Sequence, residues 1–340
     1  MSARPYIGGQ AIVEGVMMRA PRALAAAVRK PNGEIAVMSW PYRPITDRLP
    51  VLKAPVLRGG VILVESLVLG MRALNWSADQ AVEAEAEAPR DEAQKRRDQA
   101  AIAGTLAVSL GLGVLFFVAL PHLLTQGVLW LLGLQFGVEN PLFHVIAGTI
   151  KLMLFLSYLW TIGRLPDVQR LFQYHGAEHM SIYAWEAGQD LDVPTVRSWQ
   201  RFHPRCGTSF LLFVVVASIL VFAPFFALMP PLPFEGAART AVQILIKIPL
   251  MLPIAGLAYE AIRLSSRLYA VPAFRVLLMP GLWLQRLTTR DPDDAQLEVA
   301  IHSLKAAWEA HVAQGAADDM GLEGAAFQTG AAVVGGSGPA

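Results

Sequence analysis

Charge is scarce in this sequence: Asp, Glu, Lys and Arg make up only 16% of the 340 residues, against about 25% in a typical soluble domain. More than half of the residues, 54%, are hydrophobic. The 28 basic and 27 acidic residues leave a net charge of +1, so the molecule has no overall field that would attract a polyanion. The composition therefore indicates an integral membrane protein and argues against nucleic acid as a partner.

Cysteine is nearly absent as well. The single cysteine, Cys206, cannot form a disulfide within the chain, which argues against a secreted disulfide scaffold and suits a reducing compartment. The first 19 residues contain no continuous apolar run ahead of their charges, so they lack the pattern of a cleavable signal peptide. We therefore expect internal segments to direct insertion into the bilayer.

Four apolar stretches are long enough to cross a bilayer, which takes about 20 helical residues. The predicted spans are 100–120, 141–163, 207–229 and 241–261. A proline and a histidine interrupt the uncharged run after the first span, so 123–137 is predicted as a re-entrant or outer-surface helix rather than a further crossing.

Basic residues are distributed unevenly among the loops. Lys and Arg are frequent before the first span, between the second and third, and after the fourth, whereas the other two loops contain only Arg239. Short cytoplasmic loops accumulate basic residues. We therefore expect a multi-pass protein of the bacterial cytoplasmic membrane with both termini and the middle loop in the cytosol.

The chain also contains segments outside the bilayer. Residues 10–18 and 22–40 are rich in Val, Ile and Ala, and the second stretch is split by Asn32-Gly33, a hairpin signal, so three strands of a β-meander are predicted. Residues 60–76 are apolar but shorter than a standard span, and we interpret them as an interfacial helix or a helix packed beside the bundle, with a fifth crossing as the alternative.

The predicted fold class is mainly α: a polytopic helical membrane protein with about four transmembrane helices, a small N-terminal cytosolic β-meander and C-terminal amphipathic helices. The expected divisions are 1–57 for the meander, 58–98 for the interfacial helix and a charged linker, 99–163 for the first two spans with the outer segment, 164–206 for a cytosolic helix, 207–263 for the last two spans, 264–312 for interfacial and C-terminal helices, and 313–340 for a disordered tail.

The middle loop contains the pattern with the clearest chemistry. His175, Glu178 and His179 are spaced i, i+3 and i+4, which places all three on one face of a helix. In the inverted zincin pattern H-x-x-E-H, two imidazoles bind Zn²⁺ and the glutamate takes a proton from water. We expect Zn²⁺ or another divalent metal as cofactor and Glu178 as the catalytic residue. The alternative is an exposed helix whose histidines pair with Glu178 and solvent.

A zinc site of this type needs a third protein ligand. Glu260 is the first choice, because inverted zincins use a glutamate far downstream and a carboxylate at the end of a span needs a partner. His203 is the second choice, and Cys206, three residues later, is a further candidate metal ligand. The alternatives are pairing of Glu260 with Arg263, a helix-capping role for His203 and simple burial of Cys206.

Substrate-binding residues are predicted from two polar positions of the N-terminal segment and from the loop before the third span. Two consecutive glycines precede Gln10, and Glu14 interrupts an apolar strand, which suggests a polar partner. We predict Gln10, Glu14, Arg19 and Arg205 as substrate contacts. A surface pair between Glu14 and Arg19, and attraction of Arg205 to lipid phosphate, are the alternatives.

Two lysines lie within predicted spans. Lys151 and Lys247 fall in the outer halves of the second and fourth spans. Either both side chains extend outward to the membrane surface, or they line a polar path through the bundle.

Four blocks in order identify a resemblance that covers about residues 6–311. They are GGQAIVEGVMMR at 8–19, FQYHGAEHM at 172–180, HPRCGTSF at 203–210 and PGLWLQRLTTRDPDDAQLEVAI at 280–301. With these blocks the chain resembles the YqhQ-like bacterial family, a domain of unknown function labelled as a metal-dependent membrane enzyme. The resemblance implies a metal site without an established substrate. Met180 stands where the family usually has Lys, which puts in doubt a role for that cation in anion or phosphate contact.

Together these observations predict a metal-dependent membrane hydrolase with its site at the cytosolic membrane surface. The expected partners are the lipid bilayer and a membrane-embedded or lipid-linked substrate, and a homo-oligomer is allowed. The rival hypothesis is a channel, transporter or assembly factor in which the metal is structural or the histidines sense pH.

Overall fold

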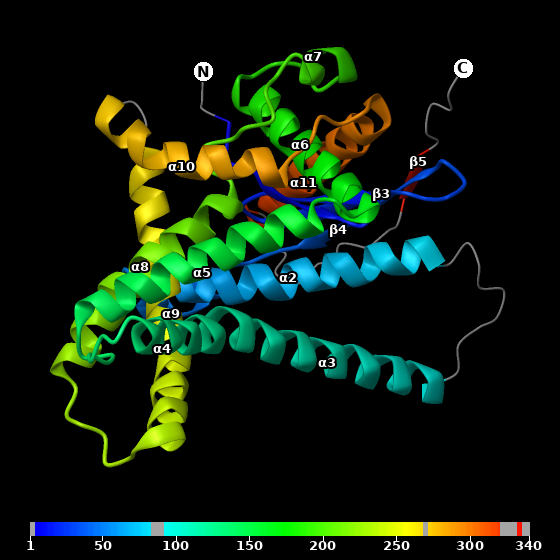
Figure 1. Ribbon diagram of the computed structural model, residues 1–340. Coiled ribbons are helices and arrows are strands. Elements are labelled where there is room, and N and C mark those ends of the chain that lie inside the picture. Colours follow the sequence, from blue (N-terminus) through cyan, green and yellow to red (C-terminus); the bar gives the residue numbers. More distant parts are fainter. Residues whose placement is uncertain (1–3, 83–91, 268–270, 320–331, 335–340) are drawn as a thin grey trace.

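The structure is a computed structural model that describes residues 4–82, 92–267, 271–319 and 332–334 (Figure 1). Four apolar helices, Ala107–Leu131, Pro141–Ile162, Phe210–Leu228 and Gly236–Leu264, are long enough to cross a membrane. The predicted class, a helical membrane protein with an N-terminal antiparallel sheet, is confirmed.

The sheet has five strands in sequential order, each antiparallel to the next. They are β1 (Gly8–Ile12), β2 (Gly15–Arg19), β3 (Ala23–Arg29), β4 (Ile35–Pro41) and β5 (Ala332–Val334). The N-terminal segment thus forms four strands rather than three. The predicted first strand is divided by a two-residue turn in which Glu14 adopts a positive φ of 52°, a conformation uncommon for residues other than glycine.

The helices account for most of the remaining chain. They are α1 (Ile45–Arg48), the short 3₁₀ helix η1 (Pro50–Lys53), α2 (Leu57–Val82), α3 (Glu92–Val114), the π-helical turn η2 (Leu115–Ala119), α4 (Leu120–Leu131), α5 (Pro141–Ile162), α6 (Pro166–Glu186), α7 (Val193–Arg197), α8 (Gly207–Leu228), α9 (Gly236–Arg267), α10 (Pro272–Thr288) and α11 (Asp294–Asp319).

The first span differs from the sequence prediction. The helix does not end at Pro121 but continues from α3 through η2 into α4, so the span is Ala107–Leu131 and no separate outer helix covers 123–137. A π turn widens the helix over Leu115–Ala119, directly before the proline. Local π geometry of this kind accommodates a residue that lacks a backbone N–H inside a membrane helix.

The sheet is covered on both faces (Figure 1). One face packs on α6 and α11 through side chains such as Met18 and Leu297, and the other packs on α2 through residues such as Met17 and Ala73. The side of α2 away from the sheet exposes apolar residues, including Leu67 and Val68. This exposed apolar face suits the interfacial position predicted for 60–76.

The C-terminal region is more ordered than predicted. The expected helix start at Asp291–Asp294 is present, because the Asp293 carboxylate accepts a hydrogen bond from the Gln296 backbone N–H at 2.7 Å. The helix α11 continues to Asp319 instead of ending at 312, and β5 pairs with β4. The rest of the tail predicted as disordered lies outside the described residues.

Candidate metal centre

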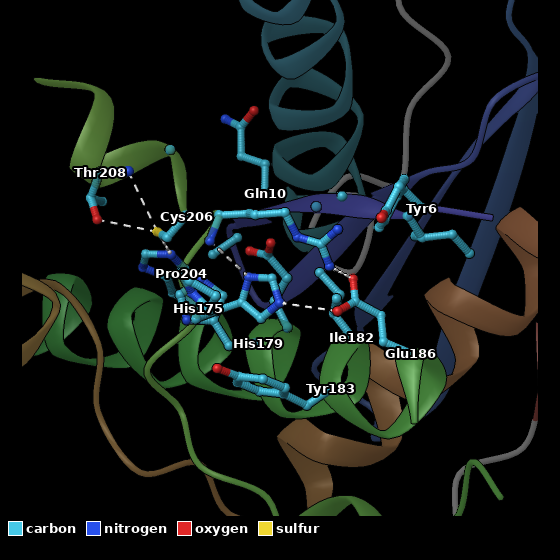
Figure 2. Close-up of a pocket in the computed structure, with 18 of the residues that line it drawn as sticks. Tyr6, Gln10, His175, His179, Ile182, Tyr183, Glu186, Pro204, Cys206 and Thr208 are labelled. Atoms are coloured by element: carbon cyan, nitrogen blue, oxygen red, sulfur yellow. Dashed lines mark hydrogen bonds and ion pairs between the residues drawn. The ribbon is translucent and has the colours of Figure 1, made fainter. Parts of the chain in front are cut away.

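A cavity of about 1090 Å³ lies where α6, β1 and the turn before α8 meet (Figure 2). Its walls include the His175, Glu178 and His179 face of α6, the backbone of β1 and the segment around Cys206. The i, i+3, i+4 spacing therefore directs all three predicted residues toward one cavity.

Helix α6 is held close to the chain that enters α11. A Cβ on Gly176 would lie 2.1 Å from the carbonyl oxygen of Arg290, so the glycine permits this approach. The Arg290 N–H in turn donates to the carbonyl oxygen of Phe172 at 2.9 Å. This packing brings the end of α10, including Thr288, alongside the histidine face.

Backbone carbonyls fix the orientation of both imidazoles. The Nδ1 atom of His175 donates to the carbonyl oxygen of Thr288 at 2.8 Å, and Nδ1 of His179 donates to that of Arg201 at 2.5 Å. Because a carbonyl oxygen can only accept, each neutral ring has its proton on Nδ1 and a lone pair on Nε2. Histidines that bind metal are oriented by the same type of hydrogen bond.

Cys206 completes a group of three donor atoms. Its Sγ lies 3.2 Å from Nε2 of His175, and the ligand atoms of His175, His179 and Cys206 all lie within 4.8 Å of one another. The thiol sits at the N-cap of α8, where Sγ accepts from the Thr208 backbone N–H at 3.4 Å and contacts the Thr208 hydroxyl at 3.1 Å. We use the name metal centre for these three residues, after the prediction that they bind a metal ion.

Glu178 is buried beside the metal centre and against β1. A Cβ on Gly9 would lie 2.7 Å from Cγ of Glu178, and the Gly9 N–H donates to the carboxylate. Burial raises the pKa of the Glu178 carboxyl, while the nearby imidazoles of His175 and His203 and the Gly9 hydrogen bond oppose that rise. A carboxyl with a raised pKa is a stronger base than an exposed glutamate.

His203 lies near the metal centre but is not one of the three converging ligands. Its Nδ1 accepts from the Arg205 backbone N–H at 3.3 Å, and its Nε2 lies 3.6 Å from a carboxylate oxygen of Glu186. Burial lowers the pKa of His203 to about 4, although Glu178 acts in the opposite direction. The ring is therefore neutral at neutral pH. Gln285 holds the His203 backbone through two hydrogen bonds of 2.7 and 2.8 Å.

The structure does not bring Glu260 to the metal centre. Its carboxylate forms a bidentate ion pair with the Arg58 guanidinium at the start of α2, 202 residues earlier in the chain. This pair satisfies the carboxylate that was expected to bind metal or Arg263. Cys206, which the sequence offered as a further candidate, is the residue that lies with the two histidines.

The four predicted substrate contacts separate into two pairs. Gln10 and Arg205 line the cavity, where Arg205 pairs with Glu186 and stacks on the ring of Tyr6. Gln10 projects from β1 toward α2 rather than toward the histidines (Figure 2).

Glu14 and Arg19 do not line this cavity. Glu14 pairs with Arg170 on α6, and Arg19 contacts Tyr42 and the Ser66 hydroxyl. The alternative Glu14–Arg19 pair is therefore not formed either. Glu14 instead joins the turn between β1 and β2 to α6, and Arg19 joins β2 to α2.

Several functional positions had no usable sequence signal. The carbonyls of Thr288 and Arg201 act through backbone atoms that any residue supplies, and Gln285 is one of many glutamines. Gly9 did have a signal, since two consecutive glycines indicate close backbone approach. The group that approaches Gly9 is the Glu178 side chain, which sequence alone did not identify.

Comparison with known proteins identifies a family whose function is unknown. The family described as "Protein of unknown function (DUF1385)" matches residues 54–310. The "Uncharacterized protein YqhQ" of Bacillus subtilis (strain 168) is 31% identical over 306 residues, which cover 88% of this chain and 91% of that relative. No solved structure gives a significant match.

Proposed function

This chain belongs to the DUF1385 family of proteins of unknown function, which confirms the resemblance seen in the sequence, and we propose that it is a metal-dependent hydrolase acting at the membrane surface. The observation that supports this proposal is the convergence of His175, His179 and Cys206 on the wall of a large cavity, with Glu178 beside them.

The donor atoms suit a zinc ion. Zinc binds nitrogen at about 2.0–2.1 Å and sulfur at about 2.3 Å, which places tetrahedral ligands about 3.3–3.6 Å apart. The separation of 3.2 Å between His175 and Cys206 is close to this value, and the spread of 4.8 Å over the whole group needs only small side-chain rotations. The hydrogen bonds on Nδ1 leave both Nε2 lone pairs available for a cation.

The residues around the metal centre suggest a division of roles. A divalent ion held by three protein ligands would act as a Lewis acid at an open coordination position. Glu178 would accept the proton of the attacking water and pass it to the leaving group. The guanidinium of Arg205 would attract an anionic part of the substrate.

The shape of the cavity favours a large substrate. Its volume of about 1090 Å³ is at the upper end of small-molecule sites, and apolar residues such as Ile182 and Leu171 share the walls with the polar groups. Arg263, near the end of the fourth span, also lines it. A lipid-linked molecule or a membrane-protein segment at the cytosolic surface would combine these features.

The non-enzymatic alternative with a structural metal requires four closed protein ligands. His203 is the available fourth candidate, but Nδ1 is already an acceptor and Nε2 faces Glu186. This arrangement favours an open position and therefore catalysis.

The test begins with the metal content of the purified protein. We expect about one zinc or other divalent ion per chain in the wild type and almost none in the His175→Ala, His179→Ala double variant. His302→Ala, on α11 and outside the cavity, is the matched control and should retain the metal. If the double variant contains as much metal as the wild type, the metal centre is wrongly assigned.

Hydrolysis is tested separately in proteoliposomes. A quenched fluorescent single-span peptide and an ester-linked fluorescent lipid serve as probes of the two substrate classes. The wild type should cleave one of them, and a chelator should abolish the reaction. Metal binding without turnover of either probe would favour the non-enzymatic alternative.

A further inference from the structure

A second cluster of ionisable side chains lies inside the bundle of spans. His122 on α4, His144 and Lys151 on α5, and Lys247 on α9 are all at most 9% exposed. We call these four residues the bundle cluster. Both lysines are buried in the protein and do not extend to the membrane surface. Ionisable residues within spans are costly and mark functional sites by default.

The two lysines have few hydrogen-bond acceptors. Lys247 Nζ donates to Nδ1 of His122 at 2.8 Å, and Lys151 Nζ donates to the Ser218 hydroxyl at 3.4 Å. Ser218 in turn donates to the carbonyl oxygen of Val215 at 2.7 Å. A protonated lysine has three N–H donors, so most donors of the two lysines lack an acceptor among the residues that the structure describes.

The imidazole of His144 supplies one further acceptor. Its Nε2 donates to the carbonyl oxygen of Val138 at 2.8 Å, so its lone pair is on Nδ1, which has no hydrogen-bond partner. The aromatic rings of Phe143, Phe222 and Phe226 lie 5.4–5.6 Å from Lys247 Nζ. Ring faces attract a cation weakly, but they do not neutralise two ammonium groups.

When both lysines are protonated, the charge of the cluster is unbalanced. Both lysines line a cavity of about 10 Å³, and none of the described residues around it carries a carboxylate. Two buried ammonium groups without a counterion would each bear a desolvation cost of several kcal/mol. An anion between them would remove that imbalance.

We infer that the bundle cluster binds one small inorganic anion, of halide size, between Lys151 and Lys247. The cavity has room for about one water-sized particle, which argues against phosphate and organic carboxylates. All four spans contribute to the walls, through Pro121, Gly148, Ser218 and Lys247 among others. The anion would therefore connect the helices of the bundle, and this site does not depend on the hydrolase proposal.

The experiment measures thermal unfolding of the detergent-purified protein in sodium chloride, bromide or gluconate at one ionic strength. A ligand that binds only the folded state raises the unfolding midpoint with its concentration. We expect the wild-type midpoint to rise by a few degrees in chloride and bromide relative to gluconate. Equal midpoints in all three salts would overturn the inference and leave a cavity that holds only water.

Variants assign the effect to the cluster. Lys151→Met and Lys247→Met keep most of the side-chain length and remove the charge, and both should abolish the difference between halide and gluconate. Lys305→Met, at an exposed position of α11, should keep the full difference. Lysine variants that retain the halide shift would contradict the proposed site.

A measurement on the wild type decides the question if the variants do not fold. The ³⁵Cl NMR line should broaden when the protein is added, and excess bromide should narrow it again while gluconate should not. A linewidth unaffected by the protein would also overturn the inference.

Discussion

The metal centre and the bundle cluster are built from similar residues but present opposite electrostatics to their cavities. In the metal centre both imidazoles donate from Nδ1 to backbone carbonyls, so lone pairs face inward. In the bundle cluster the ammonium groups of Lys151 and Lys247 face inward. Both groups contain histidine. The difference between them therefore comes from the hydrogen-bond partner of each imidazole and from the charge of the neighbouring side chains.

The two cavities also differ in size and in access to an acid or base. The metal centre opens onto about 1090 Å³ and has the carboxyl of Glu178 beside it, whereas the bundle cluster encloses about 10 Å³. The first cavity therefore fits the proposed hydrolysis, which needs room for a substrate and a group that transfers a proton. The second has room for about one water-sized particle, which fits the proposed anion and leaves no room for a substrate.

The largest expected effect tests whether the metal centre is catalytic. Glu178→Gln removes the proton acceptor but no ligand, so turnover should fall by about 10²–10⁴-fold while the metal content remains unchanged. Hydrolysis of the responsive probe and metal analysis of the same preparation measure both. A Glu178→Gln variant as active as the wild type would show that Glu178 is not the proton acceptor of the reaction.

The next effect concerns the support that β1 gives to Glu178. A methyl group at Gly9 would lie 2.7 Å from Cγ of Glu178, whereas one at Gly8 meets no atom within 4 Å. Gly9→Ala should therefore displace the carboxyl and slow turnover, by up to about 10²-fold if the shift approaches 1 Å. Gly8→Ala is the matched control. Equal rates in the two variants would show that Glu178 does not need this position.

The sequence predicts features that depend on neighbouring residues and misses those that depend on residues far apart in the chain. The four spans, the antiparallel sheet and the histidine spacing on α6 are local patterns, visible within a single window of the chain. The residue that lies beside the two histidines depended on distant partners. The pairing of Glu260 with Arg58 joins residues 202 positions apart, and nothing near either one indicated it.

At other positions the structure differs from the sequence prediction because of local backbone geometry that the residue types do not indicate. The first span passes through Pro121 because a π turn precedes it, and no residue type specifies a π turn. The first two strands are separated by Glu14 at positive φ, where glycine or asparagine would have been the expected signal. The burial of Lys151 and Lys247 could not be predicted from the sequence, because it depends on how the four helices are rotated relative to one another.

A pH effect of intermediate size is expected from the burial of the His203 imidazole in its neutral form. Burial lowers its pKa from 6.5 to about 4, so below pH 6.5 the unfolded chain takes up a proton that the folded protein does not. Stability is therefore fully present above pH 6.5 and declines as the pH falls toward 4. The shift corresponds to a loss of about 2 kcal/mol at pH 5.

Unfolding midpoints between pH 5 and 7.5, measured with a chelator present, test this effect. His203→Gln should reduce the slope in that range. It should not remove the slope entirely, because burial also lowers the pKa of His179. An unchanged slope in the variant would mean that His203 is protonated in the folded protein as readily as in the unfolded chain.

The smallest expected effect tests whether Glu14 contacts the substrate, as predicted from the sequence, or only pairs with Arg170. Its carboxylate pairs with Arg170, and the two side chains are 31% and 48% exposed, so the pair is largely solvated. Pairs of this kind contribute about 0.2–1 kcal/mol. Glu14→Gln should therefore lower the unfolding midpoint slightly and leave metal content and turnover unchanged, and Arg170→Met should behave in the same way. If Glu14→Gln instead abolished turnover while Arg170→Met did not, Glu14 would act on the substrate after a movement of β1, and the metal centre would extend to that strand.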